Sequence, residues 1–164
     1  MVTIRLADLA DAAAVGGLTH SVYVGEGYVD QEAAPDYAAE LANASRRICE
    51  AQVFVAMADD VLVGSVTAAT AGTAMSDIAQ PGELEIRMLA VVPLARSQGV
   101  ASALVSACEQ LAAARRCEGV VLSTDPKMAT AQRLYERRGY VRTPQRDWAP
   151  HTVPLLTYRL DLPR

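Results

Sequence analysis

Residues 91–102 read VVPLARSQGVAS, and this stretch decides how the chain should fold. An apolar run ends at Pro93, a short turn carries Arg96 and Gly99, and a helical pattern begins directly afterwards. The first turn of a helix leaves backbone N–H groups unpaired and carries the positive end of the helix dipole, so it can bind phosphate oxygens. The stretch therefore predicts a strand, a phosphate-binding turn and a helix. The alternative is a solvated Arg96 and a glycine that only relieves loop strain, since a short glycine motif alone is weak evidence.

The segments next to this stretch carry strand and helix patterns in turn. Residues 83–92 alternate at first and then become continuously apolar, as in a central strand that borders a cleft. From residue 99 onward, apolar residues recur at helical spacing over roughly 15 residues. A short apolar run at 119–123 then predicts a buried strand, and residues 128–138 predict a helix that ends at Gly139.

The outer segments add further strands and helices. Alternating β-rich runs predict the strands, and capped or alanine-rich runs predict the helices. The order predicts an α+β or α/β domain around one mixed sheet. The expected strands are residues 2–6, 53–57, 61–70 and 155–160, with a tight hairpin turn at 58–60, and the expected helices run from residue 8 to about Gly16-Gly17 and from 36 to about 47.

Composition limits the classes of protein that this chain can represent. With 164 residues, 51% of them apolar, it can fill one core without metals or disulfides, so we expect a single domain over residues 1–164. Cys49, Cys108 and Cys117 show no CxxC spacing and the two histidines lie far apart, so we expect no metal site.

Charge and hydropathy exclude two kinds of partner. A net charge of −4 argues against an extended nucleic-acid surface. No stretch approaches the roughly 20 uncharged apolar residues that a membrane-spanning helix needs, and the N-terminal segment lacks the pattern of a secretory signal. We therefore expect no nucleic-acid partner, no membrane partner and a cytoplasmic location.

The phosphate-loop motif resembles that of the GNAT superfamily of N-acetyltransferases. In that family Q/R-x-x-G-x-G/A follows a strand that ends in a V-x-P-like sequence, and Arg96, Gly99 and Ala101 occupy the three key positions. The resemblance implies acetyl-CoA as co-substrate, with its pyrophosphate on the loop amides and its pantetheine arm beside the preceding strand. It also implies a bulge that splays this strand from the next. The cofactor-binding residues implied in this way are Leu89, Ala90, Val91, Arg96, Ser97, Gln98, Gly99, Val100, Ala101 and Ser102.

A second segment carries the same resemblance. Residues 131–140 read AQRLYERRGY and are similar to the family segment A-x-x-L-Y-x-x-x-G-F. A tyrosine on an amphipathic helix is more often a core residue than a catalyst, but the resemblance implies that Tyr135 protonates the departing thiolate. Met128 stands where the family frequently has Asn, so a polar contact to the pantetheine arm is either missing or supplied by Ser123 or Thr124.

A carboxylate on the strand before the loop is the candidate general base. In a regular strand Glu83, Glu85 and Arg87 share one face. A carboxylate on the wall of a partly dry cleft can draw a proton from an ammonium group, through water if necessary. The alternative is that Glu85 only pairs with Arg87. The resemblance favours Glu85 over Glu83, because GNAT members often place a Glu at this position.

The resemblance also implies where the acyl acceptor enters, opposite the CoA arm. The candidate substrate-binding residues there are Tyr23, Glu26, Tyr28 and Trp148, and Arg146, Asp147 and His151 are further candidates for the lining. Alternatively, the tyrosines anchor a loop and Trp148 covers a core edge. We expect a small-molecule or peptide amine as acceptor, and family habit also allows a homodimer.

Together the motifs predict an acetyl-CoA-dependent N-acetyltransferase that transfers the acyl group to a primary amine by direct attack in a ternary complex. The implied fold is a single GNAT-like α/β (α+β) domain, with a mixed central sheet of about six or seven strands and helices on both faces. The alternative function is a non-catalytic acyl-CoA-binding regulatory domain of the same fold. A Rossmann-type nucleotide binder is disfavoured, because residues 7–17 lack GxGxxG.

Overall fold

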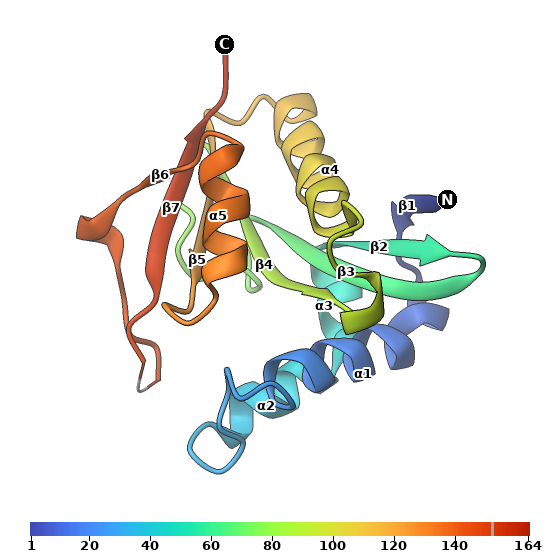
Figure 1. Cartoon of the computed structure of the whole chain (residues 1–164). Helices are drawn as coiled ribbons and strands as arrows, with labels where there is room; N and C mark the ends of the chain where they lie inside the picture. The colour runs from blue at the N-terminus through green and yellow to red at the C-terminus, as the bar shows by residue number, and fades with distance from the viewer. Residues whose placement is uncertain (152) are drawn as a thin grey trace.

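The computed structural model describes residues 1–151 and 153–164, and one seven-stranded sheet runs through them (Figure 1). The strand order is β1-β2-β3-β4-β5-β7-β6; β4 and β5 pair in parallel, and every other neighbouring pair is antiparallel. The predicted mixed sheet is therefore confirmed. The strands are β1 (Val2–Leu6), β2 (Gln52–Ala58), β3 (Val61–Thr70), β4 (Glu83–Val91), β5 (Gly119–Thr124), β6 (Val141–Arg142) and β7 (Leu156–Asp161).

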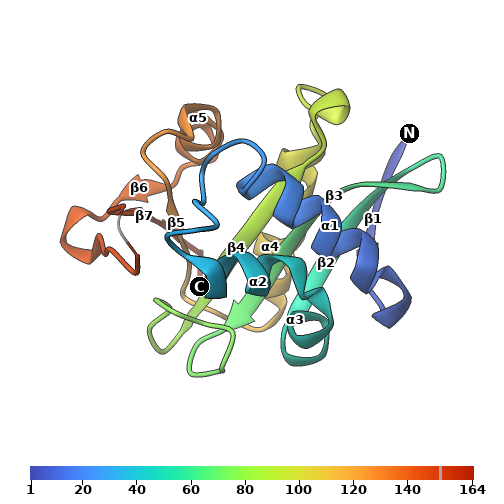
Figure 2. The ribbon, with the colours of Figure 1, turned by 90° about the horizontal axis from the view of Figure 1, so that it is seen from below.

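Helices cover both faces of the sheet, as predicted (Figures 1 and 2). On one face the apolar stripe of α4, which includes Leu104 and Cys108, packs on the main core. On the opposite face Val15 of α1 packs against Val53 and Val55 of β2. The α-helices are α1 (Ala12–Tyr23), α2 (Pro35–Ala42), α3 (Ala44–Glu50), α4 (Val100–Ala114) and α5 (Ala129–Arg137), and the short 3₁₀ helices are η1 (Leu9–Asp11), η2 (Pro93–Ala95) and η3 (Pro144–Arg146).

The first helix continues past Gly16-Gly17, where the sequence predicted its end. Asp8 caps the preceding 3₁₀ turn as expected, but α1 then runs to Tyr23. A Cβ atom on Gly16 would lie 2.0 Å from the carbonyl oxygen of Ala42. Gly16 therefore permits close approach of α1 to the end of α2, and the prediction that it terminates the helix was wrong.

The helix predicted for residues 36–47 is two helices that meet at Asn43. The guanidinium of Arg47, which is 1% exposed, donates to the carbonyl oxygens of Glu40, Leu41 and Asn43 at 2.8, 3.0 and 3.3 Å. The end of a helix leaves carbonyl groups unpaired, and here a buried arginine satisfies them. The prediction of one helix from 36 to about 47 was therefore wrong at Asn43, where the first helix ends.

Two predicted turns are confirmed. Asp59 and Asp60 have φ values of 47° and 64°, the left-handed pair of a two-residue hairpin between β2 and β3. Gly139 follows Arg138, the C-cap of α5, and has a φ of 93°, as expected for a residue that ends a helix.

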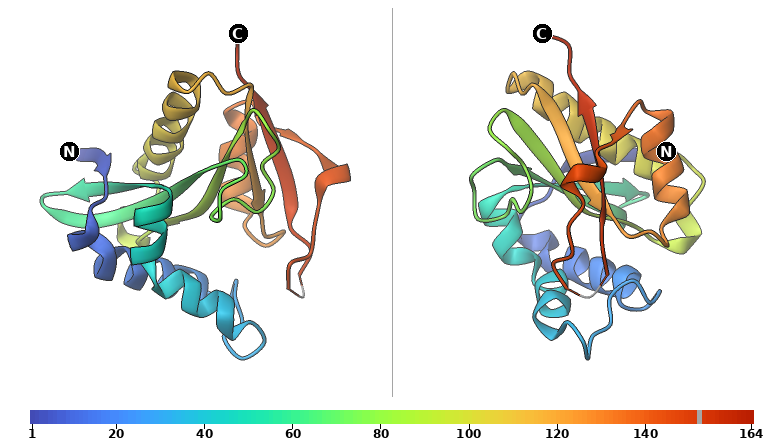
Figure 3. Two further views of the ribbon diagram at one scale, coloured as in Figure 1. Left: turned by 180° about the vertical axis from the view of Figure 1, so that it is seen from behind. Right: turned by 90° about the vertical axis from the view of Figure 1, so that its left-hand side faces the viewer.

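The central feature of the sheet is the separation of β4 from β5. Their pairing stops at Ile86 and Leu122, although β5 continues to pair with β7. The register of β4 against β3 shifts in the same region, and Met88 has a φ of 54°. This is the bulge that the family resemblance implied. Beyond it the two parts of the sheet diverge (Figure 3), and residues of β4 and β5 line a cavity.

Candidate active site

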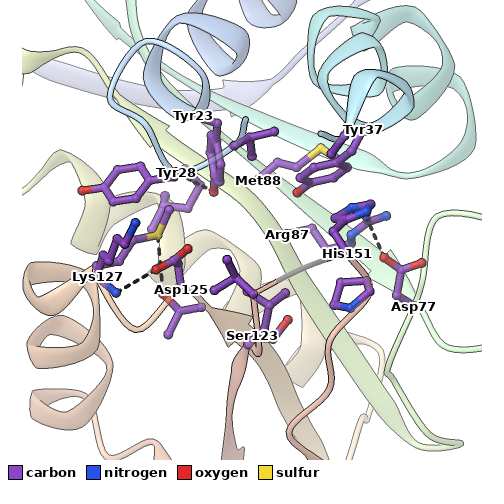
Figure 4. Close-up of a pocket in the computed structure, with 18 of the residues that line it drawn as sticks. Tyr23, Tyr28, Tyr37, Asp77, Arg87, Met88, Ser123, Asp125, Lys127 and His151 are labelled. Carbon is purple, nitrogen blue, oxygen red and sulfur yellow. Dashed lines mark hydrogen bonds and ion pairs between the residues drawn. The ribbon is translucent and has the colours of Figure 1, made fainter. Parts of the chain in front are cut away.

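A cavity of about 600 Å³ lies where β4 leaves β5. Its wall combines β4 with the end of α1, the loop before α2, the end of β5, α5 and the segment before β7. Figure 4 shows Tyr28, Asp125 and Lys127 together on one side and Tyr37, Arg87 and His151 on the other. The fold thus gathers polar and aromatic side chains from distant parts of the chain around one space.

The turn between β4 and α4 has the geometry expected of an anion site. Ser97 and Gly99 have φ values of 61° and 80°, and a Cβ atom on Gly99 would meet no atom within 4 Å. Gly99 is the N-cap of α4 and has no side chain with which to cap the first amides, those of Val100, Ala101 and Ser102. These N–H groups point out of the first helical turn and can bind a diphosphate.

Two side chains shape this turn. The side-chain amide of Gln98 donates to the carbonyl oxygen of Leu94 at 3.1 Å, which closes the turn on itself. Arg96 Nε donates to the carbonyl oxygen of Val91 at 3.1 Å, which ties the turn to the end of β4.

Arg96 also forms a bidentate ion pair with Glu26. The two Nη atoms donate to the two carboxylate oxygens at 2.6 and 2.7 Å. The hydrogen bond to Arg96 lowers the pKa of the Glu26 carboxyl below its usual value. The sequence predicted that Glu26 lines the cavity, but within the described structure it does not. Its carboxylate instead pairs with Arg96 in the turn between β4 and α4.

Tyr135 projects from α5 into the core and reaches the cavity wall. The residue is 5% exposed, and its ring lies 5.7 Å from that of Tyr140 and 6.2 Å from that of Tyr158, measured between centroids. Burial, with a smaller effect of Cys108, raises the pKa of the Tyr135 phenol well above its ordinary value. The hydroxyl therefore keeps its proton at neutral pH and can act as a donor.

Glu85 lies on the cavity wall with one carboxylate oxygen committed to a loop. Its Oε2 accepts from Ser76 Oγ at 2.8 Å and from the backbone N–H groups of residues 77–79 at 2.8, 2.9 and 3.3 Å. Oε1 lies 3.8 Å from Arg87 Nε, and it accepts no hydrogen bond from the described residues. Glu85 thus occupies both positions considered from the sequence, on the cleft wall and beside Arg87.

Tyr23, Tyr28 and Trp148 all line the cavity. The Tyr23 hydroxyl donates to the carbonyl oxygen of Leu89 on β4 at 3.0 Å. The indole nitrogen of Trp148 is buried and has no hydrogen-bond partner among the described residues. Three of the four expected acceptor residues therefore meet at the cavity, and Glu26 is the exception.

The position that departs from the family pattern also faces the cavity. Met128 lines it together with Ser123 and Thr124, and the Met128 sulfur accepts a hydrogen bond from Thr124 Oγ1 at 3.5 Å. Since Thr124 is engaged with Met128, Ser123 is the better placed of the two hydroxyls to contact a ligand.

Among the further candidates from the sequence, His151 lines the cavity in the described structure and Arg146 and Asp147 do not, while sequence reasoning missed Tyr37 and Arg87. Tyr37 on α2 stacks on His151, with ring centroids 4.9 Å apart and planes inclined by 34°. Arg87 donates to the carbonyl oxygen of Met75 at 2.6 Å and pairs with Asp77 at 2.8 Å. No local pattern marks Tyr37, whereas the alternation of β4 placed Arg87 on the same face as Glu85 and could have indicated it.

Neither a membrane-spanning helix nor a metal-binding cluster occurs among the described residues. None of their helices is long and apolar enough to cross a bilayer. They also contain no group of three or more His, Cys, Asp or Glu side chains arranged to hold a metal ion.

Several solved structures, described as acetyltransferases, share this architecture. A GNAT-family acetyltransferase from Staphylococcus aureus Mu50 has a TM-score of 0.77 at 16% identity, over 99% of this chain and 100% of that one. The PaiA N-acetyltransferase from Thermoplasma acidophilum, solved with coenzyme A, has a TM-score of 0.77 at 12% identity, over 99% of each chain. YncA from Salmonella typhimurium, a putative acetyltransferase solved with acetyl-CoA, has a TM-score of 0.66 at 23% identity, over 100% of this chain and 95% of that one. These identities show a shared fold, and no curated protein matches the chain.

The sequence itself matches a family model. The model of the acetyltransferase (GNAT) family covers residues 19–140, which include β4, α4, the turn between them and Tyr135. Because this match spans well over half of the chain, the protein belongs to the GNAT family of acetyltransferases.

Proposed function

We propose that this protein transfers the acetyl group of acetyl-CoA to a primary amine by direct attack in a ternary complex. The observation that carries the proposal is the course of β4. It forms the cavity wall at Leu89 and then leads directly into the turn where α4 presents uncapped amides. A CoA-type ligand needs an anion site for its pyrophosphate next to a channel for its pantetheine arm. Two structures of the same fold, PaiA and YncA, were solved with coenzyme A and acetyl-CoA.

The residues of the turn fit a diphosphate. The left-handed backbone at Ser97 and Gly99 turns successive amides the same way, and the absent Cβ of Gly99 leaves space for a ligand. The amides of residues 97–102 would hold the pyrophosphate, and Arg96 would add positive charge beside it by exchanging the Glu26 carboxylate for the phosphates. The main chain of Leu89, Ala90 and Val91 would run beside the pantetheine arm.

Acetyl-CoA supplies an acetyl group activated as a thioester, and the protein supplies positioning and proton transfer. In our proposal an N–H group of β4 between Leu89 and Val91 donates to the acetyl carbonyl oxygen as negative charge develops on it. Glu85 receives, through water, the proton that the amine loses. The Tyr135 hydroxyl gives its proton to the departing sulfur, and the position of this residue on the cavity wall supports this role.

The acceptor would enter from the opposite side of the cavity, beside Tyr23, Tyr28 and Trp148. Carboxylates on the wall, among them Asp77 and Glu85, favour a cationic acceptor over an anionic one. A small-molecule or peptide amine fits this description. The cytoplasmic location and the homodimer expected from the sequence stay predictions.

Two measurements test the proposal together. Calorimetric titration with acetyl-CoA should show saturable binding, and a thiol-release assay over polyamines, aminoglycosides, amino acids and N-terminal peptides should find an amine that stimulates CoA release. Binding without stimulated release for any amine class would favour the non-catalytic acyl-CoA-binding domain. Absence of binding would reject both functions.

A further inference from the structure

Tyr23 connects α1 to the part of β4 that has lost its neighbours. It is the last residue of α1, and its hydroxyl donates to the carbonyl oxygen of Leu89 at 3.0 Å. In the described sheet neither Met88 nor Leu89 has a register partner in β3 or β5. Met88 also has a φ of 54°, a backbone conformation that residues other than glycine rarely adopt. The phenol thus bonds to a β4 carbonyl group that has no ladder partner on β5.

The direction of the Leu89 peptide groups follows from the register. Val92 N–H donates to the carbonyl oxygen of Val63 at 2.9 Å, and Ala90 lies opposite Ser65 two residues earlier. Hydrogen-bonded positions alternate along an antiparallel strand, so the main-chain groups of Ala90 face β3 and those of Leu89 face away from it. The N–H and C=O groups of Leu89 therefore point toward the gap that opens beside β4.

The chemistry of Tyr23 suits a fixed donor. Burial, with smaller contributions from Tyr37 and Tyr135, raises the pKa of its phenol well above the ordinary value. The hydroxyl keeps its proton, and that proton is committed to Leu89. Figure 4 shows the ring of Tyr23 directed into the cavity, beside Met88.

We infer that Tyr23 is a positioning residue for acetyl transfer. Its hydroxyl holds the carbonyl group of Leu89 on the bulged strand. A β4 N–H group thereby meets the acetyl carbonyl in the right orientation. The inference rests on the proposed function and assigns Tyr23 a role beyond lining the acceptor site. It acts through the backbone of Leu89 and donates no proton to the reacting atoms. Ground-state binding of CoA depends mainly on the phosphate turn, so Tyr23 should affect turnover more than affinity.

The test removes only the hydroxyl, as Tyr23→Phe. We expect kcat to fall about tenfold or more while the KM for acetyl-CoA changes less than about twofold, since loss of a well-aligned oxyanion donor slows turnover selectively. Thr157→Val is the matched control, because it removes a buried hydroxyl that donates to a backbone carbonyl oxygen, that of Arg146, at 3.0 Å outside the cavity. It should keep wild-type turnover.

A spectroscopic measurement reports the carbonyl itself. Isotope-edited infrared difference spectra of bound acetyl-CoA, labelled at the acetyl carbonyl, should show a stretch lowered by hydrogen bonding in the wild type. The Tyr23→Phe spectrum should move toward that of free acetyl-CoA. The spectra are recorded with protein in excess and above its Kd for acetyl-CoA, so that free ligand does not contribute and weaker binding cannot imitate this shift.

The possible results distinguish failure of the positioning role from failure of the proposed function. Unchanged kcat and an unchanged carbonyl stretch in Tyr23→Phe, with an active wild type, would overturn the positioning role and leave the proposed function standing. Loss of one limb of the pH–rate profile would make Tyr23 a proton-transfer residue and also overturn the inference. A wild-type protein that fails to bind acetyl-CoA would overturn the proposed function and this inference with it.

Discussion

Tyr135 combines a rigid ring with a hydroxyl at the cavity. Its ring packs against those of Tyr140 and Tyr158, which belong to the segment after α5 and to β7. The orientation of the phenol is therefore set by the core and does not depend on a bound ligand. A preset donor of this kind is what protonation of a departing sulfur requires.

Replacing Tyr135 by Phe should separate chemistry from binding. We expect turnover to fall about a hundredfold or more, the usual contribution of a general acid, because the ring is kept and only the proton donor is lost. The affinity for acetyl-CoA in calorimetric titration should stay within about twofold. Wild-type turnover in Tyr135→Phe would reject the acid role.

Replacing Glu85 by Gln tests the general base. The rate should fall most at low pH, where the amine is protonated and no hydroxide is available to replace the base. Ser76→Ala is the matched control, because it removes a 2.8 Å hydrogen bond to the same carboxylate and leaves the carboxylate in place. Equal pH–rate profiles for the wild type and Glu85→Gln would remove Glu85 from the mechanism. The same change of profile in both variants would mean that Glu85 acts by anchoring the loop.

At the scale of single elements, the crossing of α1 and α2 sets the position of Tyr23. The two helices approach closely at Gly16, where an added Cβ would meet the backbone of Ala42. Gly17, the next residue, has no atom within 4 Å of the same added Cβ. Substitution by alanine should therefore cause a steric clash at Gly16 and none at Gly17.

Gly16→Ala should destabilise the protein, and Gly17→Ala should leave its stability equal or raise it by about 0.5–1 kcal/mol, because alanine is the better helix former. Thermal and urea unfolding of both variants measure the difference. We also expect Gly16→Ala to lower turnover, since a displaced α1 carries Tyr23 away from Leu89. Equal stability of the two variants would contradict the close packing of α1 on α2.

Element types were predictable from the sequence, and the ends of two helices were not. The period of the apolar residues predicted β4, α4 and α5, because that period follows from which face is buried. Gly16 and Arg47 carry signals that are ambiguous locally. A glycine terminates a helix or admits a neighbour, and an arginine is solvated or caps a buried end, depending on elements that lie elsewhere in the chain.

At the scale of the whole molecule, Glu83 joins three distant segments. Arg146 of η3 donates to both of its carboxylate oxygens at 2.9 Å, and Arg159 of β7 donates to one at 2.7 Å. Burial alone would raise the pKa of Glu83, but its hydrogen bonds to Arg146, the Gln80 backbone and Arg159 prevail and lower it from 4.5 to about 2. The carboxylate therefore holds the C-terminal segments against β4.

This pKa shift predicts how stability depends on pH. Because the folded pKa is depressed, Glu83 contributes stability that is fully present above pH 4.5 and is lost as the pH falls from 4.5 toward about 2. Urea unfolding across this window should show a steep loss for the wild type and a shallower loss for Glu83→Gln. Glu50→Gln, at an exposed pair with Arg46, is the control and should keep the wild-type slope. The same slope in Glu83→Gln would contradict the prediction.

The site was predictable only where one local segment carries it. The turn between β4 and α4 and the segment around Tyr135 are short stretches, so the family resemblance could suggest both, and their roles stay predictions. The pairing of Glu26 with Arg96, the bond from Tyr23 to Leu89 and the stack of Tyr37 on His151 join residues brought together only by the complete fold. No pattern along the chain encodes such contacts.

A crystal structure with bound CoA tests the central claim most directly. We predict that the diphosphate lies on the amides of residues 97–102 and that the CoA sulfur lies within hydrogen-bonding reach of the Tyr135 hydroxyl, with the pantetheine arm along β4 between them. A diphosphate bound elsewhere, or a sulfur remote from Tyr135, would contradict the account.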